Sequence, residues 1–166
     1  MKRNLLPLMF FAAFALLAVA IAVDCVRLAA DARDRVRMAD DELKKHEVRL
    51  TKLLASSPQL SPEVKSAIAT HEAAADIPSR HAAYDNVVTS FQKTMSQSLD
   101  ATNPLDRKFM DDTAGAINRR QVAEKPYNEE LAAYQAYLDS WRGQIARWFS
   151  TPAASDYQKS TRLLTN

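Results

Sequence analysis

Glycine, cysteine and histidine are scarce in this chain of 166 residues, which contains two Gly, one Cys and three His. Phosphate-cradling loops and dinucleotide-binding fingerprints need several closely spaced glycines, so the sequence excludes both. One Cys cannot build an internal disulfide framework or a Cys-x-x-Cys-His haem attachment site. Because so little of the backbone calls for left-handed turns, and 47% of the residues are hydrophobic, the composition favours helix.

An excess of charge is also missing once the first residues are set aside. The whole chain has 22 basic and 20 acidic residues, a net charge of +2. Lys2 and Arg3 precede the first acidic residue, Asp24, so the remainder has equal numbers of basic and acidic side chains. A neutral domain lacks the basic surface that nucleic-acid binding requires. We therefore expect no nucleic-acid partner.

A long apolar run covers residues 5–23, directly after a basic start at residues 1–4. At ~1.5 Å per residue it extends about 28 Å as a helix, close to the ~30 Å of a bilayer core, which predicts a transmembrane anchor. Cleavage-type spacing at Ala18-Val19-Ala20 and Ala20-Ile21-Ala22 leaves a signal peptide as the alternative, but the run is longer than a usual signal core. The anchor residues are Leu5, Leu8, Phe10, Phe11, Phe14, Leu16, Leu17, Val19, Ile21 and Val23.

The orientation of this anchor is less clearly marked than its existence. Lys2 and Arg3 favour a cytoplasmic start, whereas four Arg residues between 27 and 37 compete on the other side. The resemblance of the start to a secretory signal favours export of the large part. We expect a single-pass protein with a bundle at residues 24–151 and a flexible tail at 152–166.

The first helix is predicted to continue from the membrane into the domain, because neither Pro nor Gly occurs between Pro7 and Pro58. Small and apolar residues recur there at alternating steps of three and four, which is typical of paired, coiled helices. We expect charged residues such as Glu47 to lie off this seam, and His46 to be a register-fixing or pH-sensitive position within it. The seam consists of Ala29, Ala32, Val36, Ala39, Leu43, His46, Leu50 and Leu53.

Proline preceded by a capping residue marks the next helix starts, Ser61-Pro62 and Asn103-Pro104. We expect helices at about 62–76, 79–99 and 104–149, with Pro78 either kinking or reversing the chain. In the helix at 79–99 the apolar stripe is Tyr84, Val88, Phe91 and Met95.

The last helix has the clearest apolar stripe, and its register extends backwards through Arg120 and Glu124 to Thr113. Pro126 predicts a bend near Lys125. The fold class is therefore all-α, an N-terminal transmembrane helix followed by an antiparallel up-down bundle of three to four long helices. The stripe is Tyr127, Leu131, Tyr134, Leu138, Trp141, Ile145 and Trp148.

Three segments of this last helix resemble the carboxy-terminal signature of the LemA family. They begin at Arg119 (Arg-Arg-Gln-Val-Ala), at Tyr127 (Tyr-Asn-Glu-Glu-Leu) and at Trp141 (as far as Phe149). The likeness covers residues 103–149 and, more loosely, 26–54. It implies an antiparallel helical bundle anchored in a bacterial envelope, and it brings no catalytic residues.

The sequence departs from the signature of that family at several places. Gln135 replaces the second Asn, Trp141-Arg142 stands where Phe-Pro is expected, and Pro126 interrupts a helix that is usually continuous. The Asn-Leu-Val segment that follows the first helix in the family is not recognisable. The resemblance is therefore that of a divergent member.

Catalytic and metal-binding patterns are not apparent. His71-Glu72 opens like a zinc-peptidase helix, but Ala75 occupies the position of the second ligand, so His71 is interpreted as a surface residue. We expect no enzyme, no metal and no cofactor. A polar group around Pro126 is either a solvated face or a contact surface, since paired Arg beside Tyr suits a carboxylate-bearing partner. This partner-contact patch comprises Arg119, Arg120, Glu124, Tyr127, Asn128, Glu129 and Tyr134.

The sequence thus predicts a membrane-anchored helical bundle of the bacterial cell envelope, held in the inner membrane by one span and lying on the periplasmic side. It would act as a non-catalytic scaffold or interaction protein, with an unidentified protein partner and with self-association left open. The alternative is a periplasmic helical bundle that senses a small molecule between its helices.

Overall fold

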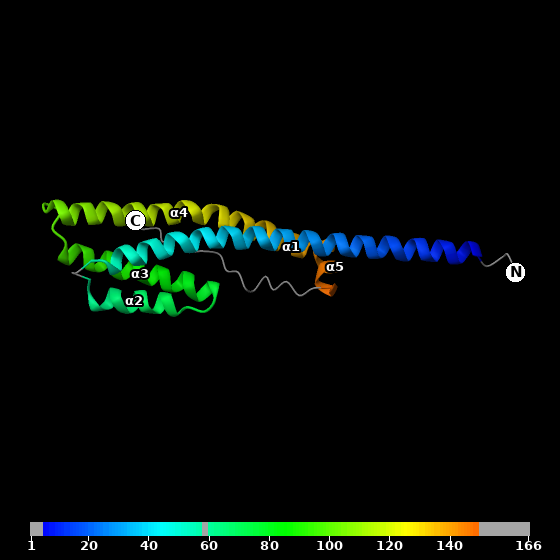
Figure 1. Cartoon of the computed structure of the whole chain (residues 1–166), viewed down its shortest axis with the longest axis horizontal. Coiled ribbons are helices and arrows are strands. Elements are labelled where there is room, and N and C mark those ends of the chain that lie inside the picture. The colour runs from blue at the N-terminus through cyan, green and yellow to red at the C-terminus, as the bar shows by residue number, and fades with distance from the viewer. Residues whose placement is uncertain (1–4, 58–59, 150–166) are drawn as a thin grey trace.

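The computed structural model describes residues 5–57 and 60–149, and this part of the chain consists of five helices without a strand (Figure 1). The expected all-helical class, with one long apolar helix near the N-terminus, is confirmed. The predicted basic start and flexible tail lie outside the described residues, as do the side chains of Leu5 and Leu8. The helices are α1 (Leu5–Ala55), α2 (Pro62–Ala73), α3 (Ile77–Ser98), α4 (Pro104–Asp139) and α5 (Trp141–Phe149).

α1 is continuous over its 51 residues, as the absence of internal Gly and of Pro after its first turn predicts. From Met9 to Val23 its large apolar side chains are exposed, and from Cys25 onward one face is buried. It is the one helix in the described part of the chain that is long and apolar enough to cross a membrane.

The helix starts follow local capping chemistry. Ser61 Oγ accepts a hydrogen bond from the Val64 amide at 3.3 Å, and Asn103 Oδ1 accepts one from the Leu105 amide at 3.0 Å. Both predicted caps are thus confirmed. Asp76 forms a third cap with the Ser79 amide at 2.7 Å. Because Asp76 caps α3, this helix begins at Ile77, two residues before the predicted start. Helix α2 ends at Ala73, earlier than expected.

From α1 to α4, successive helices run in alternating directions (Figure 1). α4 lies along α1, and α2 lies along α3 beside the end of α1 that is far from the N-terminus (Figure 1). The chain reverses between α2 and α3, with Pro78 in the first turn of α3. This settles the alternative between a kink and a reversal at Pro78.

Three apolar clusters form the core along α1. The distal cluster joins α1, α2, α3 and α4 around Leu54, Val64 and Phe91. The middle cluster joins α1 to α4 and includes Tyr127, Leu131, Tyr134 and Leu138, so this part of the predicted stripe is confirmed. The third cluster, nearest the exposed apolar run, consists of Cys25, Ala29 and Ala146.

The expected helix from Pro104 to Phe149 is wrong, because it divides at Ser140. Ser140 has an extended backbone (ψ 162°), and a new helix, α5, begins directly after it. α4 continues through Pro126 without interruption. Trp141 and Trp148, predicted to be in the core, are 60% and 83% exposed. The small residues of α5, Gly143 and Ala146, are buried instead.

The predicted seam of α1 is correct at Ala29, Ala32, Val36, Leu43 and Leu50 and wrong at two other positions. Glu47 rather than His46 is fully buried, and Leu54 rather than Leu53. His46 is half-buried and lies 3.6 Å from Glu42. The buried face of α1 is therefore shifted slightly around the helix from the predicted one. This shift places the charged side chains of Asp40 and Glu47 in the interior.

Candidate functional site

Charged side chains from four helices meet between the distal and middle apolar clusters. We call this set the buried charge cluster. Six of its seven members are buried, and Arg80 is nearly so. It consists of Asp40 and Glu47 from α1, His71 from α2, Arg80 and His81 from α3, and Arg120 and Glu124 from α4.

Glu47 is the centre of this cluster, and its side chain is 0% exposed. Arg80 of α3 donates through Nε to one carboxylate oxygen at 2.8 Å, and Arg120 of α4 donates to the other at 3.3 Å. Nε2 of His71, from α2, lies 3.6 Å from the same carboxylate. One side chain of α1 therefore contacts all three of the helices that surround it.

Arg80 joins the two carboxylates of α1. Besides Glu47, it donates a short hydrogen bond to Asp40, which lies about two helical turns before Glu47 on α1. Burial alone would lower the pKa of Arg80, but the hydrogen bond to Asp40 and the charge of Glu47 outweigh burial and raise it. Arg80 therefore stays charged in the interior.

The pKa values of the two carboxylates, Asp40 and Glu47, shift downward, whereas that of Arg80 shifts upward. Burial alone would raise the pKa of both Asp40 and Glu47. For Asp40, hydrogen bonds with His81 and Arg80 outweigh burial and hold the pKa below its usual value. For Glu47, contact with His71 and the charges of Arg80 and Arg120 have the same effect. Both groups are therefore ionised at neutral pH.

Arg120 extends the cluster onto α4. It donates to Glu124 one turn further along the same helix at 2.8 Å, and its guanidinium group lies 4.8 Å from the centre of the Tyr84 ring. Stacking of a guanidinium on an aromatic face is favourable when the pair is removed from water. Arg120 thus connects Glu47 on α1, Glu124 on α4 and Tyr84 on α3.

The two histidines complete the site and face carboxylates. His81 Nε2 lies 3.4 Å from Asp40 and 3.9 Å from Glu47, and its ring packs edge-on against Tyr127 with centroids 5.3 Å apart. The cluster has three carboxylates and two guanidinium groups, which leaves one negative charge in excess.

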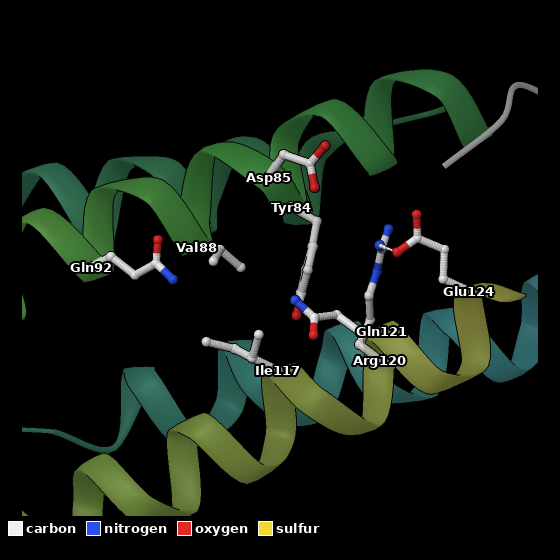
Figure 2. A pocket seen from close by; sticks show the side chains of 8 residues that line it. All are labelled: Tyr84, Asp85, Val88, Gln92, Ile117, Arg120, Gln121 and Glu124. Atoms are coloured by element: carbon white, nitrogen blue, oxygen red, sulfur yellow. Dashed lines mark hydrogen bonds and ion pairs between the residues drawn. The ribbon is translucent and has the colours of Figure 1, made fainter. Parts of the chain in front are cut away.

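A narrow crevice between α3 and α4 opens beside the cluster (Figure 2). Its volume of about 20 Å³ is enough for about one water molecule. Tyr84 Oη, Arg120 Nε and Glu124 Oε1 are buried and form no hydrogen bond with any described residue. Burial raises the pKa of Asp85 at the rim of the crevice. The crevice is lined by Tyr84, Asp85, Val88, Gln92, Ile117, Arg120, Gln121 and Glu124.

The predicted partner-contact patch does not form one exposed surface. Arg120, Glu124, Tyr127 and Tyr134 are buried, because this face of α4 packs on α1 and α3. The prediction that these four residues lie on an exposed contact surface is therefore wrong. The remaining members are Arg119 and Glu129, which are exposed, and Asn128, which is half-buried. Arg120 and Glu124 belong to the buried charge cluster instead.

Five members of the cluster were missed by sequence reasoning. No site was predicted at Asp40, Arg80 or His81. Glu47 was expected to lie off the seam and His71 was interpreted as a surface residue, but both are buried. One signal for such a site was present, since the apolar register of the last helix runs through Arg120 and Glu124. Charged residues on an apolar register indicate buried partners elsewhere, and the identity of those partners depends on the fold.

No group of three His, Cys, Asp or Glu that could hold a metal occurs in residues 5–57 and 60–149. The lone thiol, Cys25, is buried in a different cluster. What the buried charge cluster can do is lock four helices in one register and respond to protons.

Comparison of the chain with models of protein families, with curated proteins and with solved structures finds no match, so the resemblance to the LemA family stays a prediction.

Proposed function

We propose that this protein is held in a membrane by a single, uncleaved span at residues 5–23 and acts through its helical domain as a non-catalytic scaffold or interaction protein. The observation that carries the proposal is the division of α1. Its large apolar side chains from Met9 to Val23 are exposed, and the same unbroken helix then supplies the core of the domain. A lipid bilayer would cover the exposed run.

Membrane extraction tests the span with a matched pair of variants. Leu16 and Met38 lie on α1 and are similarly exposed, 72% and 64%. The wild-type chain should resist carbonate extraction. Leu16→Arg should reduce retention, because Arg at the centre of a span costs about 2.5–3.5 kcal/mol, whereas Met38→Arg should not. Equal behaviour of the two variants, or a mature product lacking residues 1–22, would contradict the proposal.

The location that we propose is the inner membrane of a bacterium, with an up-down antiparallel bundle on the periplasmic side. It is supported by the secretory character of the first residues and by the likeness to the LemA family, of which this chain would be a divergent member. A thiol at exposed Thr70 (Thr70→Cys with Cys25→Ala) should react with a membrane-impermeant maleimide in intact cells with a permeable outer membrane. Labelling only after the inner membrane is lysed would place the domain in the cytoplasm.

Contact with a protein partner is supported by the narrowness of the interior, where the crevice beside the cluster has room for about one water molecule. The exposed members of the predicted contact patch, Arg119 and Glu129, are the residues to test. A photo-crosslinking amino acid at Arg119 should capture a partner that the same group at Lys108, exposed on the same helix, does not. Identical products from the two positions would exclude this part of α4 as the contact.

Binding of a small polar molecule is the second candidate. It is favoured by the buried polar atoms of Tyr84, Arg120 and Glu124 that line the crevice. The helices would have to separate to admit anything larger than water. A ligand at a hundredfold its Kd would add about 2.7 kcal/mol to the free energy of unfolding, a shift that a thermal screen detects. The shift should be smaller in Gln121→Leu, which alters the lining without touching the buried charge cluster.

A further inference from the structure

α5 presents its two Trp rings outward and its small residues inward, and Ile145 is half-buried against the cluster of Cys25, Ala29 and Ala146. Trp141, Ile145 and Trp148 follow the i, i+4, i+7 spacing that places residues on one helix face. The two Trp rings on this face are mostly exposed, whereas Gly143 and Ala146 are buried. In water this is the reverse of the usual pattern, so the aromatic face needs an apolar environment of its own.

The position of α5 along α1 identifies that environment. Ala146 packs on Cys25 and Ala29, directly after the exposed apolar run ends. Phe149 lines an apolar hollow together with α1 residues from 18 to 27. Figure 1 shows α5 turned out of the direction shared by α1 and α4, beside the junction between the apolar run and the domain.

Specific contacts hold α5 in this crosswise position. Ser140 Oγ accepts a hydrogen bond from the Gly143 amide at 3.2 Å, which caps the new helix. A side chain at Gly143 would overlap the backbone of Tyr137 and Leu138, so the tight crossing depends on glycine. Tyr137 Oη donates to the Cys25 carbonyl oxygen at 2.6 Å and ties the end of α4 to α1.

We propose that α5 is an interfacial helix whose Trp141–Trp148 face lies at the headgroup level of the bilayer that α1 crosses. The inference rests on the membrane span proposed above. Trp is enriched at membrane–water boundaries, where its ring is partly apolar and its N–H remains hydrated. Arg142 and Arg147 are the charged residues of α5, and it contains no acidic residue, so its flanks suit phosphate groups.

A bilayer explains the aromatic face better than a second copy of the chain does. The exposed run of α1 must be covered by lipid if it spans, and α5 adjoins the end of that run, so the lipid surface extends onto α5. A protein contact would have to stop where the lipid begins. The basic flanks of α5 would also repel an identical helix.

Tryptophan fluorescence tests the proposal directly, because the chain contains two Trp residues and both are in α5. The full chain is reconstituted into vesicles of phosphatidylcholine with phosphatidylglycerol, with bromine atoms either high on the acyl chains or at their ends. Trp141→Phe leaves Trp148 as the reporter, and Trp148→Phe leaves Trp141. A control chain, Trp141→Phe with Trp148→Phe and Val122→Trp, carries one Trp on α4 where Val122 is 67% exposed.

We expect a blue-shifted emission from Trp148. Bromine high on the acyl chains should quench this emission strongly, bromine at the chain ends should quench it less, and acrylamide in the water should quench it little. The control Trp at position 122 should show the opposite pattern. Trp148 that is quenched by acrylamide and unaffected by bromine would overturn the proposal, as would protection from both, which would indicate a protein contact. Carbonate extraction of the same vesicles separates the two hypotheses, since release of the chain would reject the span itself.

Discussion

Glu47 is the residue on which the domain's helices converge. Its carboxylate is reached from α3 at 2.8 Å, from α4 at 3.3 Å and from α2 at 3.6 Å. A buried ion pair is weak evidence for net stabilisation relative to an apolar core, but removing one partner leaves the others uncompensated. A buried carboxylate at this position therefore favours the one arrangement of helices that supplies its partners.

Neutralising Glu47 should destabilise the domain strongly. Glu47→Gln preserves the volume of the side chain and leaves the guanidinium groups of Arg80 and Arg120 with reduced compensation, so we expect a loss of about 3 kcal/mol in the free energy of unfolding. Urea denaturation followed by circular dichroism measures it. Glu42→Gln, at an exposed site on the same helix, should cause no measurable change. Equal losses of stability in the two variants would show that the buried contacts of Glu47 contribute no more than an exposed carboxylate does.

The residues of the charge cluster show where prediction from sequence reaches its limit. Steps of three and four residues along α1 fit both the predicted seam through His46 and the observed one through Glu47. The two seams share most positions and differ by one residue at the others. The choice depends on whether a carboxylate can be buried, which requires partners. Those partners, Arg80 and Arg120, are distant in sequence, and only the fold brings them to Glu47.

At the scale of helices, the starts were predictable and one break was not. Ser61-Pro62 and Asn103-Pro104 are local signals that act through the adjacent turn, and the structure uses both. The break at Ser140 has a capping serine but no proline after it, and Trp141 and Trp148 continue the apolar register of α4. The crossing of α5 depends on the close approach of Gly143 to the backbone of α4.

The two glycines of the chain should respond oppositely to alanine. Gly115 lies within α4, and an added methyl group would make ordinary contact with the Arg119 side chain at 3.7 Å. Gly115→Ala should therefore stabilise the protein by about 0.5–1 kcal/mol, the difference in helix propensity. Gly143→Ala should displace α5, because the methyl group would overlap the backbone of α4.

Both glycine variants are checked by the same two measurements. Thermal unfolding gives the sign of the stability change. Reaction of Cys25 with a maleimide reports on α5, since Cys25 is buried against Ala146. Gly143→Ala should increase the rate of labelling, and Gly115→Ala should leave it unchanged. Slow labelling of Cys25 in both variants would show that α5 tolerates the added methyl group.

Over the whole molecule, α1 connects the exposed apolar run, the small-residue contact with α5 and the buried charge cluster. A tilt of α1 relative to the other helices at one of these levels is opposed at the next, because the helix is unbroken. The levels respond to different conditions. As we propose, lipid acts on the run and on α5, whereas pH acts on the Asp40 and Glu47 carboxylates of the cluster.

The stability of the domain should therefore fall in acid, with a sign fixed by the pKa shifts. The pKa values of Asp40 and Glu47 are lowered in the folded state, so their contribution is complete above the usual carboxyl values of about 4 and is lost as pH falls through the lowered ones. Asp85 has a raised pKa and acts in the opposite direction, costing stability as pH rises through that range.

Two variants separate these contributions when the free energy of unfolding is measured as a function of pH. Each proton bound by only one of the two states changes that free energy by about 1.4 kcal/mol per pH unit. Glu47→Gln removes a group that favours folding only when ionised, so its deficit relative to wild type should be largest at neutral pH and shrink in acid. Asp85→Asn removes the opposing group and should gain stability at neutral pH, where the wild-type carboxylate is ionised at a cost. A Glu47→Gln deficit that stays constant down to pH values well below 4 would mean that the Glu47 carboxylate has the same pKa in the folded and unfolded chains, and the cluster would then hold the helices together by shape rather than by charge.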